Sequence, residues 1–427
     1  MKKLLLFLLV VMMVATFALA GCKTTEEEKT EEETTEEETT EEETTEGETT
    51  EGELKQDVIK IGISSAMSGA WAILGTSQVQ GLEVAMEEVN AEGGIVIGDT
   101  QYMIDFVAYD DMMTGSGGLD AANKLIFEDN VKFIQGPTTG AYLSTIPLYT
   151  ENKIICLDIT TLPPTPDYPY KYRISFLPEV KYTAIYKAVG EKFSDAKTVA
   201  VISPNTESGH SEVEFGTPII ESLGFTIQQV EFYEDSVTDF YPVLTALLEG
   251  DPDILDMSVT SNQQTRVVIK QARELGFEGP ILSAPSTFNA LTVYEELGDA
   301  SIDCFCADFI PSYAGDKMIA FDELLSEKYG DKKGLFGVIK YTYDSTMGLV
   351  EAIRKAQSLD VDVVNETLED IVWDSLVPGL RFGGEKTFGK KGAMMSDIMT
   401  TGVNENGEAY ALQYLGPEDM AEFDCYK

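Results

Sequence analysis

From about residue 57 to its end, the chain alternates short apolar runs with longer amphipathic ones, and this alternation limits its fold more than any other feature. Residues 58–63 and 102–109 have the length and composition of buried strands, whereas residues 77–92 carry apolar side chains at helical spacing. Strands that alternate with helix-length connections form parallel sheets covered by helices on both faces. The sequence therefore predicts the α/β class with doubly wound sheets.

The alternation occurs in two successive runs, which predicts two lobes. The first run ends near residue 158, and the second begins with a predicted helix at 180–193, followed by a strand at 198–203 and a helix at 211–223. So many residues exceed what one ordinary core holds. No single stretch between the runs is rich in Gly, Ser or Pro. We therefore expect lobes joined by several short crossings rather than by one linker.

The first 21 residues have the pattern of a secretory signal peptide. Met1-Lys2-Lys3 is followed by an uncharged apolar run to Ala20 and then by Gly21-Cys22. A transmembrane helix is the alternative, but this run is near the lower length limit for spanning a bilayer. Small residues before a cysteine resemble a bacterial lipobox, in which that cysteine receives lipid. We expect Cys22 to be lipidated and the chain to be anchored to the outer face of the cell membrane.

Residues 22–56 are expected to form a disordered tether. The segment that follows Cys22 consists almost entirely of Thr and Glu, so it has little apolar surface to bury and its like charges repel each other. The whole chain carries a formal net charge of −44. A surface this acidic excludes nucleic acid as a partner, because binding to the phosphate backbone needs clustered Lys and Arg.

Polar residues follow the predicted strands of both runs. In an open α/β sheet, ligands bind beyond the carboxyl ends of the strands. Each Ser or Thr could instead cap its own helix, but the recurrence of such loops favours a cleft for a small polar ligand. The candidate ligand-binding residues in these loops are Thr138, Thr139, Gly140, Asp158, Thr160, Thr161, Ser208, Ser261, Asn262 and Ser286.

The residues that catalysis or cofactor binding would need are missing from the sequence pattern. Gly209-His210-Ser211 is close to a nucleophile elbow, but Val213 replaces the required glycine. No dinucleotide or phosphate-loop motif is present, and no His or Cys cluster has the spacing of a metal site. We expect a binding protein without cofactor or metal. We interpret Cys156, Cys304 and Cys306 as buried thiols, and a disulfide to Cys425 stays an open alternative.

Several stretches, taken in order, resemble the leucine/isoleucine/valine-binding proteins of ABC transporters. The stretches that carry the resemblance are Ile59 to Gly62, Ser68-Gly69, Gly75, Gly81, 87–95, Asp110-Asp111, 121–126, Gly136-Pro137, 238–240, 251–254, 271–276, and Tyr343-Asp344 at the start of a late helix. The resemblance implies a type I periplasmic-binding fold with three hinge crossings. It places lobe 1 at 57–176 and 308–397, and lobe 2 at 177–307 and 398–427. It also implies delivery of a small ligand to a membrane permease.

The resemblance also implies roles for single residues. Thr139 would hold the ligand carboxylate, with Thr138 and Gly140 beside it. Thr160 and Thr161 lie in the loop that would supply a backbone carbonyl and a hydroxyl. Leu74, with Trp71 a few residues earlier, would lie where relatives stack an aromatic residue on the ligand. Ser208 would replace a frequent tyrosine. Relatives often place an acid for the ligand ammonium in the loop where this chain has Pro285-Ser286, which leaves Asp158 as the nearest candidate.

An amino acid, branched-chain or related, is the first expectation for the ligand. A carboxylate without an ammonium group, an aromatic acid or an amide is the alternative. A lipoprotein of the same fold could also serve ligand sensing rather than transport.

Overall fold

The computed structural model describes residues 54–284 and 290–427. The predictions for the leader, for Cys22, for nearly all of the tether and for Ser286 fall outside these residues. Within the described part of the chain, no helix is both long and apolar enough to cross a membrane. Cys156, Cys304 and Cys306 are buried free thiols, in agreement with the prediction, and Cys425 is a buried free thiol as well.

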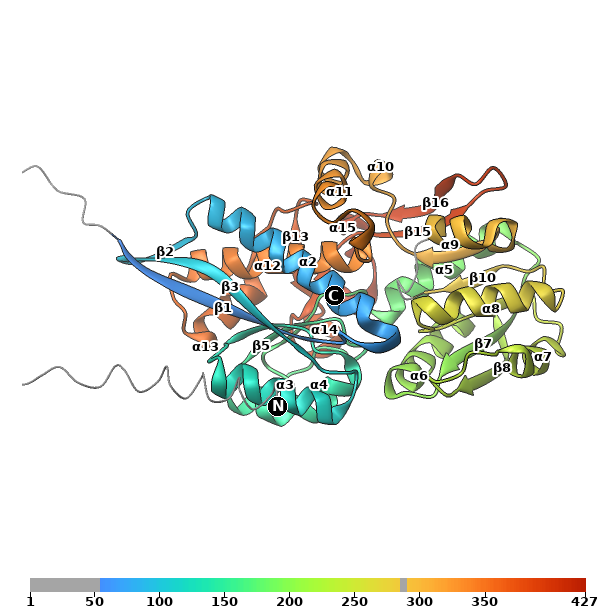
Figure 1. Cartoon of the computed structure of the whole chain (residues 1–427), viewed down its shortest axis with the longest axis horizontal. Helices are drawn as coiled ribbons and strands as arrows, with labels where there is room; N and C mark the ends of the chain where they lie inside the picture. Colours follow the sequence, from blue (N-terminus) through green and yellow to red (C-terminus); the bar gives the residue numbers. More distant parts are fainter. Residues whose placement is uncertain (1–53, 285–289) are drawn as a thin grey trace, which may run out of the picture. The chain divides into compact units, whose positions relative to one another are not determined.

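One sheet organises the elements that we call the first lobe (Figure 1). Its nine strands lie in the order β12-β13-β14-β6-β5-β4-β1-β3-β2. The strands from β14 to β3 pair in parallel, while β2, β12 and β13 are antiparallel additions at the edges. The bounds are β1 (Lys55–Ser65), β2 (Ile95–Ile97), β3 (Thr100–Asp110), β4 (Phe133–Gln135), β5 (Ile155–Asp158), β6 (Lys171–Arg173), β12 (Val372–Trp373), β13 (Leu380–Gly383) and β14 (Ala393–Met395).

Helices cover this sheet and bury its apolar strands. Helix α12 packs closely on α2, and a side chain at Gly81 would place its Cβ 2.4 Å from the carbonyl oxygen of Ile339. A glycine is therefore required where these two helices meet. The helices are α2 (Ala72–Ala91), α3 (Gly115–Asn123) with the π-helical turn η2 (Lys124–Glu128), α4 (Thr139–Glu151), α10 (Pro311–Ala314), α11 (Asp316–Tyr329), α12 (Phe336–Ala356), α13 (Val361–Asp370) and α14 (Glu385–Phe388).

A second sheet organises the second lobe. Its seven strands lie in the order β16-β15-β11-β10-β9-β7-β8, and the five from β11 to β8 are parallel. The strands are β7 (Thr198–Pro204), β8 (Thr226–Tyr233), β9 (Ile254–Asp256), β10 (Ile281–Ser283), β11 (Cys304–Ala307), β15 (Ile398–Val403) and β16 (Ala409–Leu415). The helices are α5 (Pro178–Lys192), α6 (Glu207–Ser222), α7 (Tyr241–Leu248), α8 (Asn262–Glu274) and α9 (Ala290–Leu297). The two parallel-rich sheets confirm the predicted α/β class.

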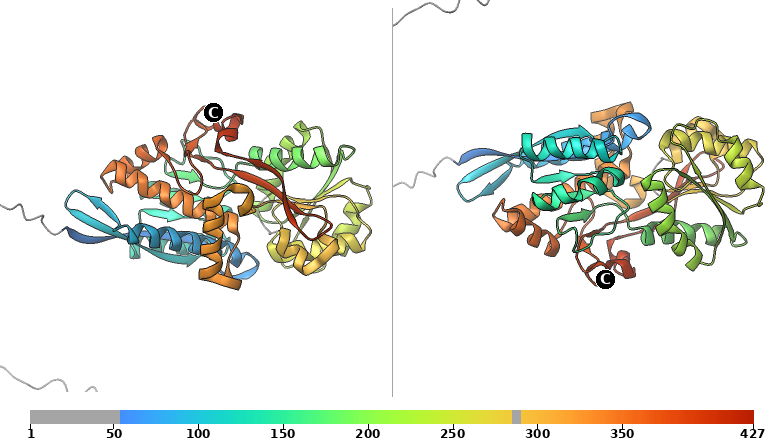
Figure 2. Two further views of the ribbon diagram at one scale, coloured as in Figure 1. Left: turned by 90° about the horizontal axis from the view of Figure 1, so that it is seen from above. Right: turned by 90° about the horizontal axis from the view of Figure 1, so that it is seen from below.

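The described chain passes between the two sheets three times: after β6, after β11, and between β14 and β15 (Figure 2). After β16 it returns toward the first lobe, which differs from the expectation that all of 398–427 belongs to the second. The hydroxyl of Tyr426 donates to the carbonyl of Met394 at 3.1 Å, and Met420 packs in the first-lobe core. Burial of these apolar side chains accounts for the return.

Three predicted helix starts were wrong. Helix α2 begins at Ala72 rather than at residue 77. Helix α6 begins at Glu207 rather than at residue 211, because the Thr206 hydroxyl accepts the Gly209 N–H and caps the helix. Asp344 does not open a helix but lies in the middle of α12, one turn after its ion-pair partner Lys340.

Candidate functional site

A cavity of about 120 Å³ lies between the carboxyl ends of strands from both lobes. Its walls come from the loops after β1, β3, β4, β5, β9 and β10, together with the end of β6 and helices α2, α4, α5, α6 and α12. This is the edge at which ligands bind in open α/β sheets. The lining residues are Trp71, Leu74, Met113, Thr138, Thr139, Ile159, Thr161, Arg173, Ser175, Phe176, Lys181, Ser208, Glu212, Val259, Ala284, Val338 and Tyr341.

Half of the candidate residues line this cavity. They are Trp71, Leu74, Thr138, Thr139, Thr161 and Ser208. Ser261 instead caps α8 by accepting the N–H of Gln264, and Asn262 borders a neighbouring hollow. Gly140 lies within α4, and Thr160 donates its hydroxyl to Asp158.

Thr139 and Thr161 form a polar wall of the cavity. The Thr139 hydroxyl oxygen accepts the backbone N–H of Thr161 at 3.1 Å and lies 3.4 Å from the Thr161 hydroxyl. Thr138 is less available, because its N–H and its hydroxyl both donate to one oxygen of Asp111, each at 3.1 Å. Burial raises the pKa of the Asp111 carboxyl. Thr139 at the start of α4 thus presents a hydroxyl to the cavity.

Asp158 forms an ion pair with a buried lysine and does not face the cavity. Its two oxygens lie 2.8 and 2.7 Å from Nζ of Lys171, and both side chains are fully buried. Asp158 also accepts the N–H and the hydroxyl of Thr160. It does not line the cavity. This placement argues against the ammonium-binding role that the sequence proposed for Asp158.

Arg173 lines the cavity and was missed from the sequence. Its guanidinium is buried at the end of β6 and donates to the carbonyls of Thr161 at 2.7 Å, Ser175 at 3.3 Å and Phe176. Burial lowers the pKa of Arg173, with Glu212 and Asp158 opposing that shift. The sequence offered little signal here, because β6 is Lys171-Tyr172-Arg173 and two of its three residues are charged.

Lys181 and Glu212 also line the cavity without having been predicted. Lys181 on α5 and Glu212 on α6 form an ion pair, and both are buried. Burial lowers the pKa of the Lys181 ammonium, and Glu212 opposes that shift. Glu212 shares the buried face of α6 with Gly209 and Gly216. An acid on the buried face of a helix was the signal that could have revealed it.

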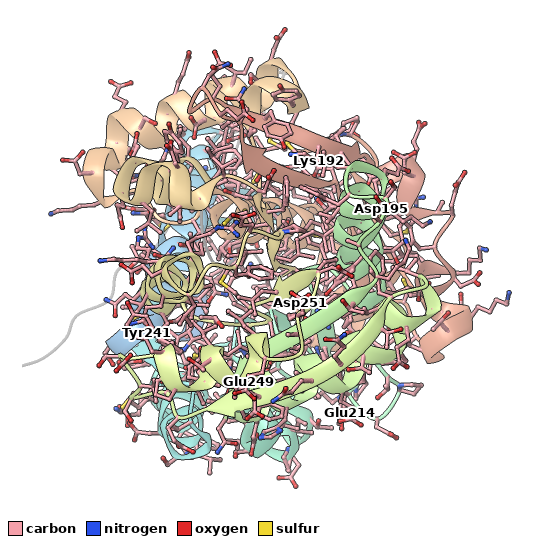
Figure 3. The ribbon with its side chains drawn as sticks, turned by 90° about the vertical axis from the view of Figure 1, so that its right-hand side faces the viewer. Lys192, Asp195, Glu214, Tyr241, Glu249 and Asp251 are labelled. Carbon is pink, nitrogen blue, oxygen red and sulfur yellow. The ribbon has the colours of Figure 1, made fainter. Side chains whose placement is uncertain are left out.

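A larger hollow of about 740 Å³ lies at the far end of the second lobe and is bordered by Lys192, Asp195 and Asp251 (Figure 3). It is formed by the segments that precede β7, β9 and β10. These are the amino ends of the strands, opposite to the edge that binds ligands in such sheets. The smaller cavity between the lobes is therefore the candidate site.

Comparisons with known proteins agree with this geometry. The family model described as "Periplasmic binding protein" matches residues 58–408. The leucine-, isoleucine-, valine-, threonine-, and alanine-binding protein of Pseudomonas aeruginosa is 23% identical over 333 residues, which cover 76% of this chain and 86% of that protein.

Solved structures share the fold. The leucine binding protein LivK from Thermotoga maritima matches with a TM-score of 0.70 at 22% identity, covering 84% of this chain and 99% of its own. A solute binding protein from Rhodopseudomonas palustris, solved with 3,4-dihydroxybenzoic acid, matches with a TM-score of 0.69 at 20% identity, covering 84% and 98%. The family is one of binding proteins rather than enzymes, as the sequence predicted. Since the matched segment spans most of its length, the chain belongs to the periplasmic binding protein family.

Proposed function

We propose that the chain is the solute-binding component of an ABC transporter, which captures a small carboxylic acid with an apolar body and delivers it to a membrane permease. The observation that carries this proposal is the composition of the cavity. The Thr139 hydroxyl and two cationic side chains meet there with a wall of apolar groups. Small-molecule sites commonly combine a few polar groups with such a lining.

The apolar wall favours a hydrocarbon or aromatic ligand body. It is formed by Trp71, Leu74, Met113, Ile159, Phe176, Val259, Ala284, Val338 and Tyr341. Burial of apolar surface contributes about 25 cal/mol per Å². An apolar cavity of about 150 Å³ holds benzene, so the volume of about 120 Å³ suits a ligand of few heavy atoms.

Two ligand classes fit this description. The names of the relatives from Pseudomonas aeruginosa and Thermotoga maritima support an amino acid with an apolar side chain. An acid without an ammonium group is favoured by the two lining cations, Arg173 and Lys181, against the single lining carboxylate of Glu212 among the described residues. The ligand of the Rhodopseudomonas palustris structure is of this second class.

A thermal-shift panel on the purified chain tests the proposal. Amino acids, their deaminated counterparts, benzoates and the matching amides should be compared. We expect one carboxylate to stabilise the folded chain by about 2.7 kcal/mol at a hundredfold excess over its Kd. The amide of that same ligand is the control and should stabilise much less. A panel in which amides bind as well as acids would contradict the carboxylate assignment.

We further propose that Cys22 carries lipid and that residues 22–56 hold the binding domain away from the membrane. The support is Leu19-Ala20-Gly21-Cys22 after a charged and apolar leader, followed by Thr and Glu repeats. The Cys22→Ser variant should lose labelling by a fatty-acid probe and leave the detergent phase on phase separation, whereas Cys425→Ser should keep both. Wild-type protein that starts at Met1 would overturn this proposal.

An uptake assay distinguishes a function in transport from a function in sensing. Deleting the gene should abolish uptake of the labelled ligand if the chain serves a permease. A ligand response that disappears while uptake persists would favour a sensing lipoprotein.

A further inference from the structure

We propose that the solute is a carboxylate without an ammonium group and that Arg173 and Lys181 supply its counter-charge. This inference rests on the proposed function and narrows it, because it selects one of the two ligand classes that the cavity admits. It also assigns a specificity role to the ion pair between Lys181 and Glu212, which links the two helices α5 and α6 at the cavity wall.

The charges on the cavity wall are unbalanced in the absence of a ligand. Among the described lining residues, Arg173 and Lys181 are bases with a formal charge of +1 each and Glu212 is an acid with a formal charge of −1, for a formal sum of +1. A carboxylate ligand of charge −1 brings the wall and its ligand to zero. A zwitterion has no net charge and would leave the sum at +1. Uncompensated charge is costly inside a protein.

Two other buried acids near the cavity have partners of their own. Asp158 pairs with Lys171. Asp256 accepts the hydroxyl of Tyr186 at 2.6 Å and the N–H of Ser258 at 2.6 Å. Burial raises the pKa of Asp256 to about 6, and Lys181 opposes this shift weakly. None of these acids is among the lining residues, so none is placed to meet a ligand ammonium.

Arg173 is a buried basic residue with no carboxylate at ion-pair distance in the described part of the chain, although Glu212 and Asp158 act on it at longer range. Its three hydrogen bonds go to carbonyl oxygens, which are neutral acceptors. A guanidinium has five N–H donors, so two remain. Arginine binds carboxylates through pairs of N–H groups, and such charge-assisted bonds are about twice as strong as neutral ones. A ligand carboxylate between Arg173 and Thr139 would supply the missing charge.

Lys181 disfavours the binding of a ligand ammonium group in the cavity. The one lining carboxylate, on Glu212, already faces the Lys181 ammonium at ion-pair distance. A ligand ammonium on Glu212 would lie beside Lys181 in a buried setting, where like charges repel strongly. No acid occurs between Ala284 and Ala290 in the sequence to take this role instead.

Matched ligand pairs test the inference on the purified full chain. Leucine is compared with 4-methylpentanoate and 4-methyl-2-oxopentanoate, and phenylalanine with 3-phenylpropanoate, by isothermal titration calorimetry. In the pair that binds, the deaminated acid should bind at least tenfold more tightly than the amino acid. Equal or tighter binding of the amino acid overturns the inference and leaves the proposed function intact. If no acid in the panel binds, both this inference and the proposal that the solute is a carboxylate fail.

The Glu212→Gln variant gives a readout with opposite signs for the two ligand classes. Removing the carboxylate frees Lys181 for the ligand, so affinity for the deaminated acid should rise by threefold or more. If Glu212 instead held a ligand ammonium, the same variant would lose tenfold or more in affinity for the amino acid, and the inference would be wrong. Glu207→Gln, in the first turn of the same helix, is the control and should change neither affinity. Circular dichroism of each variant verifies that it is folded.

Discussion

The Lys340→Met variant should lower the free energy of unfolding by about 3–5 kcal/mol. Nζ of Lys340 lies 2.7 Å from Asp344 and 2.7 Å from Asp397, and all three side chains are fully buried. Methionine would leave two carboxylates buried without a counter-charge. Urea unfolding at pH 7, followed by circular dichroism, measures the loss.

The pH dependence distinguishes this explanation from simple loss of packing. Burial opposes the charge of Lys340, but Asp344 and Asp397 outweigh burial and raise its pKa above 10.5. A lysine whose pKa is higher in the folded than in the unfolded state stabilises fully below the unfolded pKa, and this contribution is lost as pH rises through the folded pKa. The difference in unfolding free energy between wild type and Lys340→Met should therefore stay constant around neutral pH and narrow only as the pH rises above about 10.5.

Lys55→Met is the matched control, since Lys55 pairs with Asp99 where both side chains are 73% exposed. It should leave the unfolding midpoint unchanged. If Lys340→Met were as stable as this control, the buried network would not be holding the helix α12 against the crossing between β14 and β15, where Asp397 lies.

The fold could be predicted from the chain's periodicity because buried parallel strands and their crossover helices leave distinct apolar patterns. The same rule placed Thr139 and Thr161 at the carboxyl ends of strands, and the structure brings both to the cavity. The first residues of helices were harder to predict, because a helix cap such as Thr206 depends on one local hydrogen bond.

The charged groups of the site could not be predicted, because they depend on contacts between elements. Lys181 and Glu212 lie on different helices and meet only when α5 packs on α6. Asp158 followed a predicted strand as a ligand-binding acid should. The strand register instead places Asp158 beside a lysine. Strands β5 and β6 pair in parallel, with Cys156 opposite Lys171 and Asp158 opposite Arg173, so Lys171 and Asp158 lie on neighbouring strands.

This register leads to the second large effect, in the Lys171→Met variant. The substitution leaves Asp158 fully buried, with only the N–H and hydroxyl of Thr160 as donors. Removing one partner of a buried pair costs about 3–5 kcal/mol. Lys171 also lies 5.3 Å from the ring centre of Tyr142, a contact that methionine partly retains. The free energy of unfolding in urea should fall accordingly.

The double variant Lys171→Met/Asp158→Asn should recover most of this loss. Burial lowers the pKa of Lys171 and outweighs the opposing effect of Asp158. The ion pair therefore stabilises the fold little more than a neutral replacement would. The destabilisation by Lys171→Met therefore comes from the carboxylate left behind rather than from the bond removed, and a double-mutant cycle isolates that difference. A double variant less stable than Lys171→Met alone would contradict this explanation. It would mean that the Asp158 carboxylate stabilises the fold through its hydrogen bonds to Thr160 even when Lys171 is absent.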